Sequence, residues 1–187
     1  MSRIVYRHEN VERCVVGTVG APGERTFFLQ VRSEEGFNSI VLEKAQVQAL
    51  IERLQLMIRE LRRNRLAGTH ELNAPAIKDD QTLEYPISED FRAGVIAISY
   101  EQGDQNIELQ IQALTEDEHQ ELIDIDEAGD GEVLPDLLLV KLSIPMVRGF
   151  TERASNVVAA GRTPCPFCGI PLNPEGHLCP RANGYRR

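Results

Sequence analysis

APGERTFFLQV, residues 21–31, recurs in altered form eighty positions later as EQGDQNIELQI, residues 101–111. In each stretch a glycine and an acidic residue precede a Leu-Gln pair, and an apolar, β-branched run stands before it: VVGTVG at 15–20 and VIAISY at 95–100. Two apolar runs separated by a Gly-containing turn are typical of a β-hairpin. The sequence therefore predicts two related hairpins.

Each predicted hairpin is followed by a third strand and a helix. FNSIVL (37–42) and DLLLVKL (136–142) have the apolar content of strands. After the third strand, the two copies of the repeat match at an offset of one hundred residues. In the first copy, apolar residues recur at helical spacing, at positions 47, 50, 54, 57, 58 and 61. We expect an α+β fold with two tandem β-β-β-α repeats, at about 11–66 and 91–161. Their antiparallel sheets are expected to join or pack together, with both helices covering one face.

The second copy carries about twenty extra residues before its third strand. This acidic insertion, 115–135, has nine Asp or Glu residues and no Lys or Arg, which favours a solvated loop. The join between the copies, 67–90, predicts a long loop with one short strand. We therefore divide the chain into a duplicated domain, 1–161, and a C-terminal tail, 162–187. Chance similarity between two amphipathic hairpins is the alternative explanation of the repeat.

Composition and charge argue against several classes of protein. The 187 residues carry a formal net charge of −9, which disfavours a protein whose entire surface follows nucleic acid. No stretch reaches the ~18–20 consecutive apolar residues of a membrane helix. MSRIVYRHEN (1–10) lacks the apolar segment of a secretory signal. We expect no membrane association and a cytoplasmic location, in which cysteines stay reduced.

The C-terminal stretch CPFCGIPLNPEGHLC contains the metal-ligand pattern Cys165-x2-Cys168-x8-His177-x-Cys179. Three thiolates and one imidazole are a typical tetrahedral set for Zn²⁺, and Gly169 permits the positive φ that closes a Cys-x2-Cys turn. Four ligands close the coordination shell, whereas a catalytic zinc keeps one position open for water. The sequence therefore predicts a structural zinc knuckle.

Other assignments for the cysteines and histidines stay open. An iron–sulfur cluster prefers four thiolates, and folding could bring Cys14 to the tail as the fourth. A disulfide fits poorly with a reducing compartment. Cys14 lies in an apolar strand-like run and is expected to be a buried, inert thiol, with a nucleophilic pairing to His8 as the alternative. His8, His70 and His119 lie in loop-like contexts and are expected to be solvated.

Arginines form a candidate anion or partner patch. Four of them crowd the end of the first predicted helix, where cations also offset the helix dipole. From Lys141 onward the sequence has seven Lys or Arg residues and two Glu residues, so the C-terminal quarter is locally basic. The members of the patch are Arg59, Arg62, Arg63, Arg65, Arg181, Arg186 and Arg187.

The opening RIVYRHENVERCVVGTVGAPGERTFFLQV (3–31) and the ending CPFCGIPLNPEGHLCPRANGYRR (165–187) resemble an actinobacterial family, domain of unknown function 3090. The most specific segments are CPFCG at 165–169, GHLCP at 176–180 and the closing RANGYRR. The resemblance implies a zinc-ribbon-like tail and assigns no activity. Such proteins are often encoded beside a phosphomutase-like histidine phosphatase and a kinase-like protein, which implies those two as candidate partners.

The sequence favours a protein-interaction or adaptor module that binds zinc and is not an enzyme. It contains no G-x-x-x-x-G-K-[ST], H-E-x-x-H or G-x-S-x-G motif. The alternative is a single-stranded nucleic-acid (RNA or DNA) binding protein, for which Phe27, Phe28 and Tyr100 are the strand aromatics that bases could stack on. The third hypothesis is an enzyme of unknown type with a site between the repeats.

Overall fold

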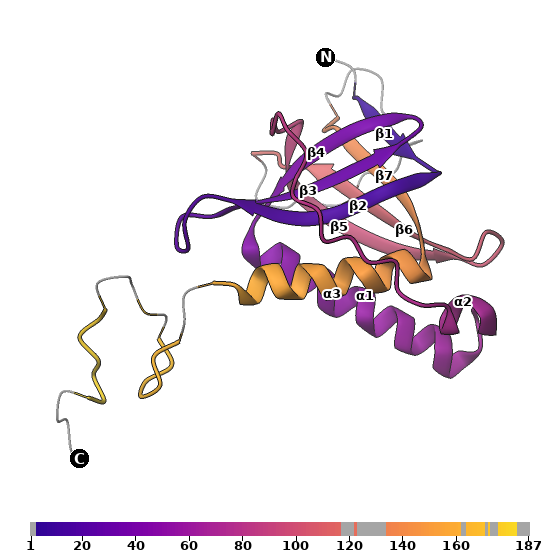
Figure 1. Cartoon of the computed structure of the whole chain (residues 1–187). Coiled ribbons are helices and arrows are strands. Elements are labelled where there is room, and N and C mark those ends of the chain that lie inside the picture. The colour runs from indigo at the N-terminus through magenta and orange to yellow at the C-terminus, as the bar shows by residue number, and fades with distance from the viewer. Residues whose placement is uncertain are drawn as a thin grey trace.

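The computed structural model describes residues 3–116, 122, 134–161, 164–170, 172 and 176–182. These residues form one curled seven-stranded sheet and three helices, which confirms the predicted α+β class (Figure 1). Within this described part of the chain, every helix is too short or too polar to cross a membrane.

A short first strand is followed by two groups of three strands and a long helix. The elements are β1 (Val5–His8), β2 (Val11–Val19), β3 (Thr26–Ser33), β4 (Gly36–Leu42), α1 (Lys44–Asn64), α2 (Thr69–Asn73), β5 (Phe91–Glu101), β6 (Asn106–Ala113), β7 (Leu137–Ser143) and α3 (Ile144–Ala159). The order β2-β3-β4-α1 thus recurs as β5-β6-β7-α3. The strand predicted within 67–90 was wrong, because that segment contains the short helix α2.

The two groups of strands join edge to edge in a single sheet, in the order β1-β7-β6-β5-β4-β3-β2. Within each group the neighbours are antiparallel. β4 and β5 are parallel, with Ile40 opposite Phe91 and Val41 opposite Arg92, and β1 is parallel to β7. The expectation that the two sheets join is therefore confirmed.

Strand register corrects the sequence alignment of the two hairpins. Cys14 on β2 lies opposite Val31, and the matching position on β5, opposite Ile111, is Ile96. The first strands therefore match at an offset of 82 residues, whereas the alignment used 80 throughout the hairpin. The cause is turn length, because residues 20–25 connect β2 to β3 but 102–105 connect β5 to β6.

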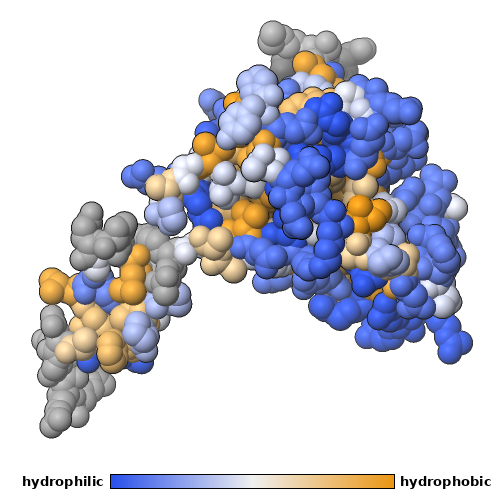
Figure 2. Space-filling view, in the orientation of Figure 1, coloured by the Kyte–Doolittle hydropathy of each residue, from blue (hydrophilic) through white to orange (hydrophobic). Residues whose placement is uncertain are grey.

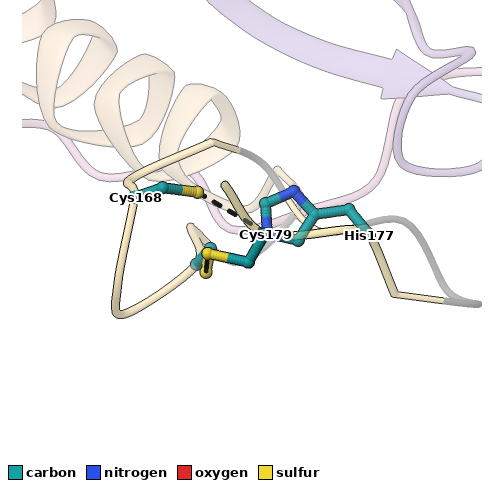
Figure 3. A group of neighbouring side chains, drawn as sticks. Cys168, His177 and Cys179 are labelled. Atoms are coloured by element: carbon teal, nitrogen blue, oxygen red, sulfur yellow. Dashed lines mark hydrogen bonds between the residues drawn. The ribbon is translucent and has the colours of Figure 1, made fainter. Parts of the chain in front are cut away.

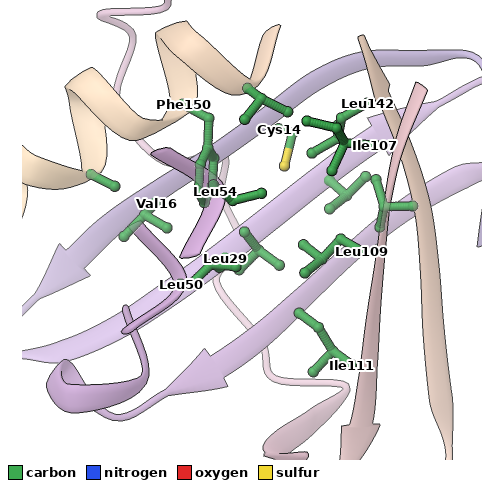
Figure 4. Close-up of a cluster of buried hydrophobic side chains, with 14 of the residues drawn as sticks. Cys14, Val16, Leu29, Leu50, Leu54, Ile107, Leu109, Ile111, Leu142 and Phe150 are labelled. Carbon is green, nitrogen blue, oxygen red and sulfur yellow. The ribbon is translucent and has the colours of Figure 1, made fainter. Parts of the chain in front are cut away.

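The hydrophobic core lies between one face of the sheet and the two long helices (Figure 4). Val47, Leu50 and Leu54 on α1 are buried, as the helical spacing predicted. Strand side chains that share this core include Val16, Leu29, Ile40, Ile107, Leu109, Ile111, Leu138, Val140 and Leu142. Val147, Phe150 and Ala154 complete it from α3. Both helices thus cover the same face of the sheet.

The join between the two groups crosses the opposite face of β2 and β3 (Figure 1). Leu83 packs over Gly17, where an added Cβ would lie 2.5 Å from the leucine Cγ. Gln30 exchanges two hydrogen bonds with the backbone of Glu84. Arg13 donates from Nε to Oδ2 of Asp79 at 2.7 Å, and this contact lowers the pKa of the carboxyl. These bonds hold residues 79–84 against the outer face of the sheet.

Residues 77–79 cover the free edge of β2 together with α3. The Ile77 N–H donates to the carbonyl of Pro145 at 3.0 Å. Arg153 donates from Nε to the Val16 carbonyl at 3.0 Å and from Nη1 to Asp79 Oδ1 at 2.9 Å. An uncovered edge strand invites pairing with other chains, so this cover favours a discrete molecule.

Replacing Gly149 by alanine is expected to destabilise the body of the protein. The new Cβ would lie 1.7 Å from the Ile77 carbonyl oxygen, and Ile77 is fixed by its bond to Pro145. Alanine adds about 1 kcal/mol of helix propensity, but overpacking against backbone costs about 1–3 kcal/mol or more, so the clash dominates. Urea unfolding followed by circular dichroism measures the change. Gly103→Ala, where the nearest atom is 3.4 Å away, is the control and should stay within about 0.5 kcal/mol of wild type. Equal stability of the two variants would contradict this packing.

Candidate metal centre

A tight turn brings the first two cysteines of the tail together. The Gly169 N–H donates to the Cys165 carbonyl, and the Cys165 N–H donates to the Ile170 carbonyl, both at 2.9 Å. Gly169 has a φ of +76° and Gly176, just before the histidine, has a φ of +83°. The positive φ predicted at Gly169 is therefore confirmed, and it lets the chain fold back between the two pairs of ligands.

The four predicted ligands converge on one point. One ligand atom from each of Cys165, Cys168, His177 and Cys179 lies within 4.8 Å of all the others. Cys165 Sγ lies 3.8 Å from Cys179 Sγ, and Cys168 Sγ lies 3.5 Å from His177 Nε2. Figure 3 shows Cys168, His177 and Cys179 facing one another. The cluster could hold a metal ion.

These separations fit a tetrahedral ion of the size of Zn²⁺. Bonds of about 2.3 Å to sulfur and about 2.0–2.1 Å to nitrogen place two sulfurs about 3.8 Å apart and a sulfur and a nitrogen about 3.5 Å apart around one centre. The observed distances of 3.8 Å and 3.5 Å match both values. A disulfide bond is about 2.0 Å long, and all four cysteines are free, so the disulfide alternative does not describe this arrangement.

The electrostatics of the cluster favour a cation at its centre. Backbone N–H groups of Cys168 and Phe167 lower the pKa of the Cys165 thiol to about 6. Burial, together with the neighbouring Cys165 and Cys179, raises the pKa of Cys168. A second and third thiolate beside the first are therefore unfavourable until a positive ion compensates them.

Cys14 does not join the tail cluster. It is buried in the core of the body, and desolvation raises the pKa of its thiol to about 12. The predicted inert thiol is confirmed. An iron–sulfur cluster that uses Cys14 as its fourth ligand is excluded by this position, and so is a thiolate nucleophile.

His8 is buried, which contradicts the expectation that it is solvated. Only 2% of its surface is exposed, and its Nε2 lies 2.8 Å from Asn38 Oδ1. Asn38 donates its amide to Asp90, so its oxygen must accept from His8. Nδ1 of His8 lies 2.5 Å from the hydroxyl oxygen of Ser33. His8 is thus engaged by two polar partners and is not paired with Cys14.

The other two histidines lie elsewhere. The side chain of His70 is 93% exposed at the start of α2, as predicted. His119 lies outside the described residues.

The arginines of the candidate patch do not gather in one place. Arg62 donates to the Leu72 carbonyl, and Arg65 caps the end of α1 in the left-handed conformation. Arg181 belongs to the tail, which Figure 1 shows at the opposite end of the helix layer from the end of α1. Arg59 lines a groove of about 400 Å³ between α1 and α3, and Arg63 is exposed. Arg186 and Arg187 lie outside the described residues.

The strand aromatics do not form an open platform for bases. Phe27 is 4% exposed and belongs to the core, while Phe28 and Tyr100 are half-buried. Beside β5, where the two groups of strands meet, lies a cavity of about 330 Å³. Its lining residues are Gln46, Ala49, Leu50, Arg53, Ile96, Ala97 and Ile98. This set contains no carboxylate, histidine or cysteine for acid–base or nucleophilic chemistry.

Sequence reasoning missed three side chains of the tail. Phe167, Ile170 and Leu178 are exposed, although large apolar residues usually indicate burial. Phe167 directly precedes the ligand Cys168, and Leu178 stands between His177 and Cys179, so a signal was present in the motif. Neighbouring positions cannot all point inward, so apolar residues interleaved with ligands point outward.

Cys168→Ser is expected to release the metal and loosen the tail while the body stays folded. The substitution removes one of four ligands, whereas the tail residues lie outside the hydrophobic core of the body. Metal content by mass spectrometry should fall from one ion per chain toward zero. The urea midpoint of the helical signal should stay unchanged, with Cys14→Ser as the control that keeps the metal. Loss of the body's structure in the same cooperative step would contradict this independence.

Thiol titration should separate Cys14 from the three tail cysteines. With metal bound, few thiols should react with an aromatic disulfide reagent at pH 8. A strong chelator should then expose three, because the tail thiols have lost their ion. The fourth should react only in denaturant, because Cys14 is buried and its pKa of about 12 keeps it protonated. Reaction of all four thiols in the folded, chelated protein would contradict the buried position of Cys14.

Comparison with known proteins identifies a family. None of the curated proteins or solved structures that were compared gives a significant match. The model of one family, described as protein of unknown function (DUF3090), matches residues 6–179. The matched range includes all four ligands and ends at Cys179, so the closing RANGYRR lies beyond it. The chain therefore belongs to the DUF3090 family of proteins of unknown function.

Proposed function

We propose that this protein is a non-enzymatic, zinc-binding protein that acts as a protein-interaction or adaptor module. The observation that carries the proposal is the convergence of three thiols and one imidazole within 4.8 Å of one another. Such a set fills the tetrahedral shell of Zn²⁺ and leaves no position for a substrate or an activated water. A zinc bound there stabilises the tail and performs no chemistry.

Zinc is the ion that best fits this ligand set. Thiolate ligands favour soft or borderline ions, and a tetrahedral S₃N arrangement is typical of structural zinc. Iron–sulfur clusters prefer four thiolates, and the fourth cysteine of this chain is buried in the body.

We further propose that residues 1–161 form a duplicated domain and 162–187 a separate zinc-binding tail. Support comes from the strand order and pairing sense that β2-β3-β4 and β5-β6-β7 share. The long helices add to it, because α1 begins at Lys44 and α3 at Ile144, an offset of one hundred residues. Duplication would give the body two similar halves and leave the tail outside them.

The partners that we propose follow from the family resemblance. Members of the family are often encoded beside a kinase-like protein and a phosphomutase-like phosphatase, so an adaptor that binds one of them in the cytoplasm is the simplest arrangement. In this arrangement the catalytic steps belong to the partners. The cavity beside β5 supports that division, because its lining residues include no acid–base pair.

Native purification tests the proposed function. The untagged chain, isolated at mild ionic strength from the cells that produce it, should elute in a stoichiometric complex, with one zinc per chain. The purified chain alone should show no turnover of p-nitrophenyl phosphate or of a panel of phosphorylated metabolites. Cys168→Ser should lose the complex together with the metal. Recovery as a monomer that turns over any of these substrates would contradict the proposal.

A further inference from the structure

The tail presents three large apolar side chains to solvent. Phe167, Ile170 and Leu178 are 62%, 48% and 87% exposed, and we call these three residues the apolar tip. They are three of the ten large apolar side chains exposed in the described chain, although only fifteen of the described residues belong to the tail. Figure 2 shows hydrophobic residues gathered on the described part of the tail, while the visible side of the body is largely hydrophilic with separate hydrophobic patches. Exposed large apolar side chains are therefore more concentrated on the tail than isolated apolar residues on a protein surface usually are.

The metal ligands explain why these side chains point outward. Cys165 and Cys179 are 5% and 7% exposed, so the interior of the tail is filled by ligands and not by an apolar core. Phe167 lies between two ligand cysteines, and Leu178 lies between His177 and Cys179. Once the ligands face the centre, their neighbours face solvent. The metal therefore fixes the geometry of the apolar tip.

A positive charge lies at the border of the apolar tip. Arg181 donates from Nη1 to the Phe167 carbonyl at 3.2 Å, which holds the guanidinium at the backbone of that residue. The sequence 162–187 contains four Arg residues and one Glu residue. Among the described residues, Arg181 thus sets a positive charge at the apolar tip, and the complementary surface is an apolar cleft bordered by carboxylate.

We propose that the apolar tip is the docking surface of this protein and that it enters an apolar, acid-rimmed cleft on a partner protein. This inference rests on the proposed function and assigns the interaction to three residues. Exposed Ile170 and Leu178 favour a protein over single-stranded nucleic acid, because aliphatic side chains offer bases no ring to stack on.

The body of a second copy is a poor receptor for the apolar tip. The groove between α1 and α3 is lined by Arg59, Arg148 and one carboxylate, Glu152, and the only charged residue among the described ones that line the cavity beside β5 is Arg53. Each of these two hollows therefore carries a net positive charge, which would repel Arg181. This charge favours a different protein as the source of the cleft.

Site-specific cross-linking in the producing cells locates the contact. Benzoylphenylalanine replaces Leu178 in one variant and Gln55, which lines the groove between α1 and α3, in the other. We expect an adduct with one protein at position 178 and none at position 55. That protein is then identified by mass spectrometry, purified, and titrated with the full-length chain.

Affinity for the identified protein supplies the decisive measurement. Leu178→Ser should raise Kd by about tenfold or more, as expected for an apolar anchor at an interface. Arg181→Glu should also raise Kd, by a factor that shrinks as salt increases. Leu56→Ser, which alters an exposed leucine on α1, is the matched control and should leave Kd unchanged. Zinc content must stay at one per chain in all three variants.

Each other outcome overturns the inference in a recognisable way. Adducts at position 55, with unchanged Kd for Leu178→Ser, would place the partner on the helix groove and leave the proposed function standing. An adduct at position 178 with a second copy of the chain, or with nucleic acid, would reassign the occupant. Absence of adducts at both positions, with recovery of the chain as a monomer, would overturn the proposed function as well.

Discussion

His8 on β1 lies 2.5 Å from Ser33 on β3 and 2.8 Å from Asn38 on β4, although several strands separate β1 from both in the order of the sheet. These bonds can form only if the sheet curls until its β1 end approaches the β3–β4 hairpin. Asn38 passes the connection to Asp90, whose N–H also bonds the Ser39 carbonyl at the start of the parallel contact between β4 and β5. One buried imidazole thus joins the β1 end of the curled sheet to the β3–β4 hairpin, and every polar group that it meets is satisfied.

The curl determines what each surface of the sheet can do. Its inner face closes around the hydrophobic core, and α1 and α3 cover the remaining opening. Its outer face is held by residues 79–84 through Arg13 and Gln30, and α3 covers the free edge of β2. The outer face of β2 and β3 and the free edge of β2 are therefore occupied within the molecule.

Local patterns in the sequence predicted local structure well. The apolar spacing of Val47, Leu50 and Leu54 identified the buried face of α1, and the Cys-x2-Cys and His-x-Cys pairs identified a cluster that the fold brings together. The bonds of His8 have no such signal, because one polar residue in a four-residue strand has no period and its partners are 25 and 30 positions away. The offset of 82 residues between β2 and β5 could not be read from the sequence for a similar reason, since the apolar pattern does not encode the length of a turn.

The body and the tail are stabilised by different physical forces. The body buries a continuous apolar cluster that includes no described residue of the tail, so its stability does not need the ion. The tail buries Cys165 and Cys179, exposes Phe167, Ile170 and Leu178 and only half buries Leu172, so burial of hydrocarbon contributes little to its order. Metal–ligand bonds can order the tail, since structural zinc sites contribute apparent free energies of about 10–16 kcal/mol at pH 7. An exposed apolar surface costs solubility in any protein, and the ion that we propose would order this one. Under the proposed function, binding of a partner at the tail therefore depends on metal, whereas the fold of the body does not.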